Sequence, residues 1–483
     1  MWNGPLEQIN EYTFRIPQNY KSGMRVEGRL YAGERLLADI RQDRAPEQVA
    51  NVACLPGIVG ASLAMPDIHW GYGFPIGGVA ATDPEDDGVI APGGIGYDIN
   101  CGVRFLRTTL MKEEVTSSIS ALADALSQMI PSGVGSKGKV RISGKEEKKL
   151  LAQGARWAVR QGMGVEHDLE MCEEHGGFQD ADPDVVSERA YARGKPQSGT
   201  LGSGNHFLEV QVVDEIYDLQ AAAVMGISPG QIGVMIHTGS RGFGYQVCAD
   251  SLKVMAQCVV KYRLDLPDRQ LACAPLNSPE ARRYLGAMRC AANYAWANRQ
   301  VLTHLTREGF EKIFGQGWSK MGMNLVYDVA HNIAKMETHL IQGQKKTLCV
   351  HRKGATRAFG PGNPEIPERY RDIGQPVIIP GDMGRVSFLL AGTKKAEQET
   401  FGSTCHGAGR LKSRKEATRT VQLSRLMSDL KQKNIEVRAA GKATLVEEAP
   451  AAYKDVNDVV NVVHQAGIAR KVARLRPLCV VKG

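Results

Sequence analysis

Short apolar runs that end in glycine-rich loops recur from one end of this 483-residue chain to the other. Examples are GIVGASLAMPD near the start, VMIHTGSRGFG in the middle and VIIPGDMGRVSFLLAGT further on. Apolar runs bounded by glycine are typical of strands, and the loops between them need the backbone freedom of glycine. No repeat, low-complexity tract or obvious linker interrupts the pattern. We therefore expect one large mixed α/β (α+β) domain, residues 1–483, with central β-sheets surrounded by helices.

Helices are predicted where apolar residues recur three and four positions apart, at residues 117–130 and at about 278–315. A basic helix is predicted to start near residue 414, and another helix is predicted at 455–475. The runs FLEVQVVDEIY, IGVMIH and NLVYDVAHN predict strands. The run EHDLEMCEEHGGFQDADPD is acidic and irregular, so we expect residues 160–195 to form an acidic surface insertion or lid within the domain.

Composition narrows the class of protein. A hydrophobic content of 43% and a charged content of 23% are those of a globular chain that buries a core. The chain shows neither a membrane-length apolar run nor a basic-then-apolar N-terminus, and its ten cysteines are scattered without a CxxC pair. We expect a cytoplasmic protein with reduced thiols and no membrane partner. The net charge of +8 permits a polyanionic partner such as nucleic acid without requiring one.

Five of the glycine-rich loops carry side chains that bind metals or attack phosphorus. A single histidine in such a loop is more often a core or surface residue than a ligand. Here, however, each histidine ends a strand-like run, and strand ends are where α/β folds build their sites. In GGIGYDINCGVR, an Asp and a Cys three residues apart could reach one ion. The candidates are Asp98, Cys101, His206, His237, His331 and His406.

The types of these side chains restrict the metal. One carboxylate, one thiolate and three imidazoles suit a borderline divalent ion such as manganese, zinc, iron or cobalt, and suit magnesium and calcium poorly. A thiolate can bridge two ions, so the five ligands could serve a two-metal site. Metals about 3.5–4 Å apart clamp phosphoryl oxygens in displacement reactions.

Four glycine loops also carry phosphate-binding side chains. GTLGSGNH, HTGSRGFG, HRKGATRAFGPG and CHGAGR combine backbone N–H donors with Arg241, Lys353, Arg357 or Arg410. None is a Walker loop or a Rossmann fingerprint. Each alone is more often a tight turn with a surface arginine. Together, beside the candidate metal ligands, they favour phosphoryl or nucleotidyl transfer.

The segment after His406, GAGRLKSRKEATR, is strongly basic. It predicts either a solvated charged helix face or a track for a phosphate backbone. Aromatic residues make up 6% of the chain and do not interleave with this run, so the sequence gives no support for recognition by base stacking.

Several long motifs resemble those of the RtcB family of GTP-dependent RNA ligases. They are MPDIHWGYGFPIGG, GGIGYDINCGVR, GTLGSGNHFLEV, HTGSRGFG, VAHN, HRKGATRAFGPG and STCHGAGR, and the match runs from about residue 25 to Lys482. The resemblance implies a domain with a metal and nucleotide cleft. It also implies an enzyme that joins RNA 3′-phosphate or 2′,3′-cyclic phosphate ends to 5′-hydroxyl ends, in tRNA splicing or RNA repair. GTP, two manganese ions and an archease-type activator belong to the same expectation.

The resemblance assigns roles to individual residues. His406 would attack GTP and form a histidine–GMP intermediate. One manganese would be bound by Asp98, Cys101 and His206, and the other by Cys101, His237 and His331. The RNA phosphates would contact Arg193, Arg241 and Arg414. Contacts to the guanosine nucleotide would come from Asn205, His206, Phe207, Leu208, Glu209, His331, Asn332, Pro380, Gly381, Asp382, Met383, Ser387, His406, Gly407, Ala408, Gly409 and Lys482.

One position departs from the pattern that the resemblance implies. In IPGDMGRVS, Asp382 stands where Ser or Thr is expected. A carboxylate facing phosphates is repulsive unless it pairs with Arg385 or Lys353, binds a metal or turns away. The alternative function is a metal-dependent cyclic phosphodiesterase or other phosphohydrolase without ligation. A non-enzymatic RNA-binding or metal-storage protein would leave the histidine in HGAG unexplained.

Overall fold

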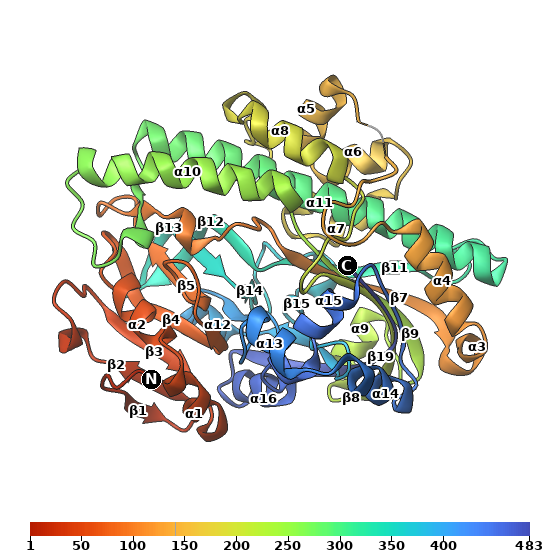
Figure 1. Ribbon diagram of the computed structural model, residues 1–483. Helices are drawn as coiled ribbons and strands as arrows, with labels where there is room; N and C mark the ends of the chain where they lie inside the picture. The colour runs from red at the N-terminus through yellow and green to blue at the C-terminus, as the bar shows by residue number, and fades with distance from the viewer. Residues whose placement is uncertain (141) are drawn as a thin grey trace.

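Two mixed β-sheets form the centre of the molecule in the computed structural model, which describes residues 1–140 and 142–483 (Figure 1). The seven strands of the first sheet follow the order β1 (Glu7–Asn10), β2 (Thr13–Ile16), β3 (Glu27–Tyr31), β4 (Ile58–His69), β5 (Ile76–Thr82), β13 (Gln344–Lys353) and β12 (Asn332–Ile341). The eight strands of the second follow the order β11 (Asn324–Ala330), β7 (Gly102–Met111), β9 (Gln231–Thr238), β8 (Phe207–Ile216), β19 (Ala469–Lys482), β16 (Ser387–Gly392) and β15 (Pro376–Ile379), with β18 (Glu436–Ala439) beside β19. Shorter ladders join β6 (Val89–Ile90) to β10 (Ala274–Pro275) and β14 (Ala355–Arg357) to β17 (Ser403–Cys405).

The chain passes from the second sheet to the first through a single residue, His331. Strand β11 ends at Ala330 and pairs with β7, whereas β12 begins at Asn332 and pairs with β13. The backbone N–H of His331 donates to the carbonyl of Cys101 at 2.9 Å. The two sheets therefore meet at a predicted metal ligand.

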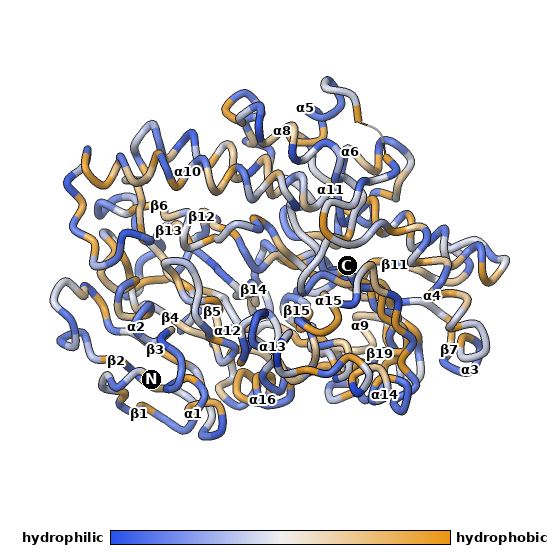
Figure 2. Tube along the Cα trace, in the orientation of Figure 1, coloured by the Kyte–Doolittle hydropathy of each residue, from blue (hydrophilic) through white to orange (hydrophobic). Residues whose placement is uncertain are grey.

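Two long helices, α10 (Arg241–Lys261) and α11 (Pro279–Phe314), run side by side across one face of the molecule (Figure 1). Hydrophilic and hydrophobic segments alternate along α10 in Figure 2, because one side of this helix packs inward and the other faces water. Helix α11 instead buries residues along most of its length. The largest hydrophobic cluster includes residues of the second sheet and of both helices.

The periodicity of the sequence predicts two helices closely. Helix α4 (Ile119–Met129) occupies the stretch predicted at 117–130, and α11 occupies the stretch predicted at 278–315. The hydroxyl of Ser278 accepts the N–H of Ala281 at 3.2 Å and caps α11, and Gly315 ends it with φ of 65°. Helix α13 (Arg414–Thr420) starts at the predicted position.

The helix predicted at 455–475 is wrong in its second half. Helix α16 (Val456–Gln465) ends early, Gly467 turns the chain with φ of 77°, and β19 begins at Ala469. The sequence from 469 to 475 has spacing that suits either state. Pairing of β19 with β8 and β16 decides for the strand.

The segment 160–195 packs partly into the interior. Asp168 is buried and accepts both guanidinium branches of Arg307 at 2.7 Å, and buried Glu173 lies 2.8 Å from Lys335. Two of its acidic residues therefore pair with buried cations and do not belong to a charged surface. That the whole segment is an insertion or lid stays a prediction.

The remaining helices are short and surround the sheets. They are α1 (Glu34–Gln42), α2 (Ala45–Val52), α3 (Lys112–Thr116), α5 (Gly144–Gln153), α6 (Ala155–Arg160), α7 (Glu166–Glu170), α8 (Glu188–Gly194), α9 (Leu219–Met225), α12 (Lys394–Glu399), α14 (Leu423–Gln432) and α15 (Lys442–Glu447). In the part of the chain that the structure describes, no helix has the length and apolar character needed to cross a membrane.

Candidate metal and nucleotide site

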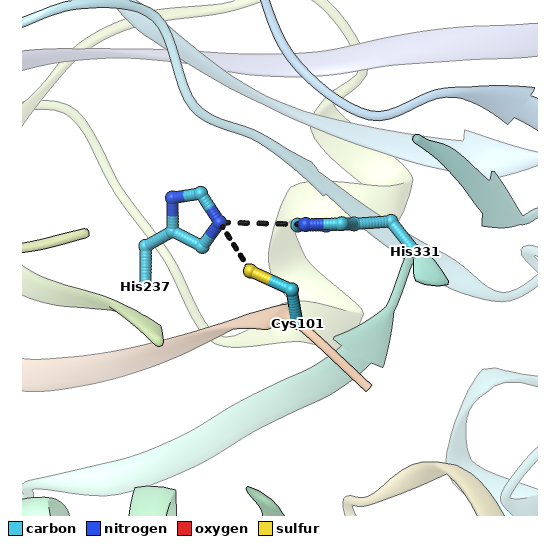
Figure 3. A group of neighbouring side chains, drawn as sticks. All are labelled: Cys101, His237 and His331. Carbon is cyan, nitrogen blue, oxygen red and sulfur yellow. Dashed lines mark hydrogen bonds between the residues drawn. The ribbon is translucent and has the colours of Figure 1, made fainter. Parts of the chain in front are cut away.

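Three of the predicted metal ligands meet where the second sheet joins the first. The Nε2 atom of His237 lies 3.3 Å from the sulfur of Cys101 and 3.4 Å from Nε2 of His331 (Figure 3). The three side chains come from the residue before β7, from β9 and from the junction of β11 with β12. All three are buried, so the neighbouring strands fix their positions.

A second group shares the same thiol. The sulfur of Cys101 lies 3.4 Å from Nε2 of His206, which is 2.9 Å from Oδ2 of Asp98. Within each group the ligand atoms lie within 4.8 Å of one another. A Cβ atom at Gly239 would come 2.4 Å from Asp98, so a residue without a side chain is needed there. The structure thus brings all five predicted ligands together around Cys101.

The electrostatics of this cluster suit a cation. Burial lowers the pKa values of His237 and His331 well below the usual range, so both rings are neutral and offer lone pairs. Burial also raises the pKa of the Cys101 thiol, and nearby Asp98 raises it further. The thiol therefore stays protonated until a cation displaces its proton. Burial would raise the pKa of Asp98 too, but the hydrogen bond with His206 lowers it to about 2.

His406 directly follows β17 and is held by Asp67 of β4. Its Nδ1 atom lies 2.5 Å from Oδ2 of Asp67, and its backbone N–H donates to the same oxygen at 2.9 Å. Burial would raise the pKa of Asp67, but the electrostatic interaction and hydrogen bonds with His406 lower it. The ionised carboxylate accepts Nδ1–H, which leaves the lone pair of His406 on Nε2.

Buried Lys454 fixes the strand segment around Asp67. Its amine donates to the carbonyl oxygens of Pro66 at 3.1 Å and of Ile68 at 2.5 Å, on either side of the carboxylate residue. Burial lowers the pKa of Lys454 to about 8. Asp67 belongs to the motif MPDIHWGYGFPIGG, but the sequence alone did not indicate its role. No motif surrounds Lys454.

His406 opens into a cavity of about 590 Å³. Most of the predicted nucleotide contacts line it, namely Asn205, Phe207, His331, Asn332, Pro380, Gly381, Asp382, Met383, Gly407, Ala408, Gly409 and Lys482. Leu208, Glu209 and Ser387 lie behind this lining, and His206 faces a neighbouring cavity. Ser387 supports the lining indirectly, because its hydroxyl accepts the N–H of Gly381 at 3.1 Å.

Glu209 lies behind the lining of this cavity, and Tyr453 is part of the lining. Glu209 is buried, and burial raises its pKa to about 8 despite a 2.7 Å hydrogen bond from Gln211. Tyr453 lines the cavity and donates to Glu448. Sequence analysis misses Tyr453 because no motif surrounds it.

Asp382 pairs with Arg385. Its carboxylate is buried, with Oδ2 3.2 Å from Nε of Arg385 and Oδ1 accepting the N–H of Gly384 at 3.1 Å. Burial raises the pKa of Asp382, while the charge of Arg385 acts in the opposite direction. The sequence left open whether Asp382 pairs with a cation, binds a metal or turns away. The structure shows that it pairs with Arg385 and also lines the cavity.

The four phosphate-type loops do not all face the cavities. Lys353 and Arg410 line the first cavity, and Arg241 lines the second. Arg357 is buried and lies 3.3 Å from Glu174 and 3.4 Å from Glu365, so its charge is used inside the fold. A glycine loop with an arginine is thus insufficient to predict a phosphate contact.

A second cavity of about 500 Å³ meets the first at Asp98 and contains the three predicted RNA contacts, Arg193, Arg241 and Arg414. The guanidinium of Arg193 lies 4.8 Å from the ring centre of Tyr245. Arg241 lies 3.3 Å from Nδ1 of His206 and so adjoins the metal cluster. Arg414 is 56% exposed and pairs with Glu448 at 3.0 Å.

Arg299 of α11 connects the loops that carry three of the ligands. Its fully buried guanidinium donates to the carbonyl oxygens of Asn100 at 2.8 Å and Thr238 at 3.0 Å, and to both carboxylate oxygens of Asp328 at 2.8 Å. These partners lie within three residues of the ligands Cys101, His237 and His331. Arg299 is a positioning residue that the sequence did not reveal.

The chain matches known proteins along most of its length. The family model described as tRNA-splicing ligase RtcB matches residues 48–483. A tRNA-splicing ligase RtcB from Archaeoglobus fulgidus is 56% identical over 480 residues, which is 99% of each chain. Those from Thermococcus kodakarensis and Methanococcus maripaludis are 55% and 54% identical over 479 and 478 residues, again 99% of each chain.

Proposed function

This chain belongs to the RtcB family, and we propose that it is the RNA ligase of tRNA splicing or RNA repair. It joins an RNA 3′-phosphate or 2′,3′-cyclic phosphate end to a 5′-hydroxyl end and consumes GTP. The observation that carries the proposal is the contact of His406 with Asp67 beside a cavity that Cys101, His237 and His331 also line. The candidate nucleophile, the anion-binding loops and three candidate metal ligands therefore face the same cavity.

Two manganese ions are the proposed metals. The shared thiol suits this arrangement, since Asp98, Cys101 and His206 would hold one ion and Cys101, His237 and His331 the other. These donors fit a borderline divalent ion, and the raised pKa of Cys101 means that its thiolate needs a cation beside it. When bound, the ions neutralise phosphate charge. Arg299 holds the loops that carry Cys101 and His237 in place relative to each other.

His406 is the proposed nucleophile. Its Nε2 lone pair attacks the α-phosphorus of GTP, an N–P bond forms, the bond to the bridging oxygen breaks and pyrophosphate leaves. Asp67 holds Nδ1–H and stabilises the positive charge that develops on the ring. GMP then passes to the RNA 3′-phosphate, and the 5′-hydroxyl loses its proton and displaces GMP. A 2′,3′-cyclic end must first be opened by water.

GTP and the RNA phosphates are assigned to different cavities. GTP binds among the glycine loop after His406, the loop at Gly381 and Lys482, which all line the first cavity. RNA phosphates contact the arginines of the second cavity. The ten free, buried cysteines suit a reducing compartment, and we place the enzyme in the cytoplasm.

Retention of radiolabel from α-labelled GTP on the denatured protein tests the proposal. With manganese, we expect one GMP per chain on the wild-type protein and none on His406→Ala. We also propose an archease-type activator, which the resemblance implies, and the test is run over a single turnover without it. Opening of a cyclic phosphate without any GMP adduct would instead support the metal-dependent phosphodiesterase.

A further inference from the structure

Trp70 is an exposed indole at the rim of the first cavity. Its side chain is 47% exposed, whereas Trp2, Trp157 and Trp296 are buried. It directly follows β4, three residues beyond the Asp67 that holds His406. A large aromatic side chain that stays in water beside a binding cavity is a candidate contact for a ligand.

The backbone around Trp70 is fixed. Its N–H donates to the carboxylate of Asp43 at 3.1 Å. The buried side-chain amide of Gln48 makes two hydrogen bonds with the backbone of Gly71, the next residue. It accepts the N–H at 3.0 Å and donates to the carbonyl at 2.7 Å. The backbone at Trp70 is therefore held in place, and the indole is exposed at the cavity rim.

The side chains around Trp70 include cations as well as the carboxylate of Asp43. The guanidinium of Arg44 lies 5.6 Å from the centre of the indole ring, and Lys412 lines the same cavity from the segment after His406. The sequence alone separates this aromatic residue from the basic run, but the fold places both around one cavity. Aromatic and cationic side chains together are the pattern that binds single-stranded nucleic acid.

Ligation needs two RNA ends, and the site has two adjoining cavities. Trp70 lines the first cavity, while Arg193 and Arg241 line the second, which meets the first at Asp98. We propose that Trp70 stacks on the nucleobase at one of the two RNA ends being joined. The inference rests on the proposed ligase function. Guanine of GTP is not its partner, because the nucleotide is assigned to the part of the cavity lined by Phe207 and Lys482.

Stacking suits an enzyme that must accept different RNA ends. Every base has a π-face, so an indole holds the terminal nucleotide without selecting its sequence. An indole on a held backbone would help to orient the terminal sugar and its phosphate relative to His406. Trp70 would thus act on RNA affinity and joining, and not on attack of His406 on GTP.

The test uses full-length Trp70→Ala and Trp70→Phe proteins, with Tyr217→Ala as a control at an exposed aromatic residue that lines neither cavity. In Trp70→Ala we expect GMP-adduct formation within about twofold of wild type. RNA affinity and single-turnover joining should fall by about tenfold, which corresponds to 1.4 kcal/mol. Trp70→Phe should recover most of the loss, and Tyr217→Ala should show none.

Oligonucleotides that lack the base at the 3′ or the 5′ terminus identify the contact. Wild type should bind both abasic RNAs more weakly than the intact RNA. With one of the two abasic RNAs, Trp70→Ala should bind as well as wild type does, because the base on which the indole stacks is missing. Equal penalties of Trp70→Ala on the intact and both abasic RNAs would overturn the proposal. Loss of GMP-adduct formation in folded Trp70→Ala would also overturn it and assign the indole to GTP. If wild type forms no adduct and joins no RNA, the proposed function itself fails.

Discussion

At the scale of single residues, the contact between His406 and Asp67 makes the strongest mechanistic claim. Oδ2 of the carboxylate accepts two backbone N–H groups, from His406 and Gly407, besides meeting the imidazole. This fixes the ring and its tautomer together. The arrangement matches the pairing of histidine and aspartate in other enzymes that use a histidine lone pair.

We expect Asp67→Asn to slow guanylylation by at least about a hundredfold. An amide cannot carry the charge that stabilises the cationic ring, and it favours the wrong tautomer. The measurement is the single-turnover rate of GMP-adduct formation, with bound manganese determined on the same samples. Unchanged metal content together with a slow rate assigns the effect to His406. A wild-type rate in Asp67→Asn would contradict the role given to the carboxylate.

We expect phosphate binding to depend on pH through Lys353, which lines the first cavity. Its amine donates to the carbonyl oxygens of Tyr72 at 2.6 Å and Phe74 at 3.2 Å, and burial lowers its pKa to about 7. The charged form predominates below pH 7 and is lost above it. Because an anion binds the charged amine, affinity for phosphate groups should fall as pH rises from 6 to 8, by at most about tenfold per pH unit.

Binding of a 3′-phosphorylated oligonucleotide in metal-free buffer measures this effect. Lys353→Arg is the control, because arginine keeps its charge throughout and the phosphate titrates identically with both proteins. The ratio of wild-type to Lys353→Arg affinity should fall as pH rises. A constant ratio between pH 6 and pH 8 would show that the amine does not meet the phosphate.

At the scale of elements, helix α11 illustrates what the sequence reveals and what it hides. The apolar spacing predicts its bounds to within a residue at each end. It does not predict that Arg299 and Arg307 point inward, because charged helix residues usually face water. Their burial depends on Asp328 and Asp168, which come from distant segments.

These two arginines form a matched pair for testing the role of Arg299. Arg299→Lys keeps the buried charge but loses the planar fork that reaches Asn100, Thr238 and Asp328 together. Manganese should bind about 10- to 100-fold more weakly, as is usual when residues behind metal ligands change. Arg307→Lys disturbs an equally buried pair that contacts no ligand loop.

Metal affinity from equilibrium titration and thermal unfolding are measured on both variants. We expect both to lose stability but only Arg299→Lys to lose metal affinity. An equal loss of affinity in the two proteins would mean that Arg299 supports the fold in general and does not position the ligands.

At the scale of the whole molecule, residue types and spacing alone could not predict that the candidate ligands meet at Cys101, which only the family resemblance implied. The candidate ligands were found from residue type and from their places at strand ends. The ligands come together at Cys101 through strand pairing, because Cys101 precedes β7, which lies between β9 and β11 in the second sheet. His331 joins this group because one residue links the two sheets. Pairing partners that lie far apart in sequence leave no local signal.

The two cavities adjoin, because four residues, Tyr97, Asp98, Asn205 and Arg414, line both. Arg414 lines both cavities, so its side chain lies where the nucleotide space and the arginine-rich space meet. Its exposed guanidinium, paired with Glu448, can reach a phosphate if that pairing is exchanged. GMP-adduct formation involves no RNA and should therefore tolerate loss of this side chain.

We expect Arg414→Ala to weaken RNA binding and joining while guanylylation persists. Loss of one phosphate contact should reduce the slope of log affinity against log salt by about 0.7 for single-stranded RNA. Lys442→Ala, a basic residue that lines neither cavity, is the control and should leave the slope unchanged. An unchanged slope in Arg414→Ala would place the guanidinium on a solvated face, which is the alternative that the basic sequence after His406 left open. Because the slope counts phosphate contacts and not overall stability, it separates a lost RNA contact from a damaged fold.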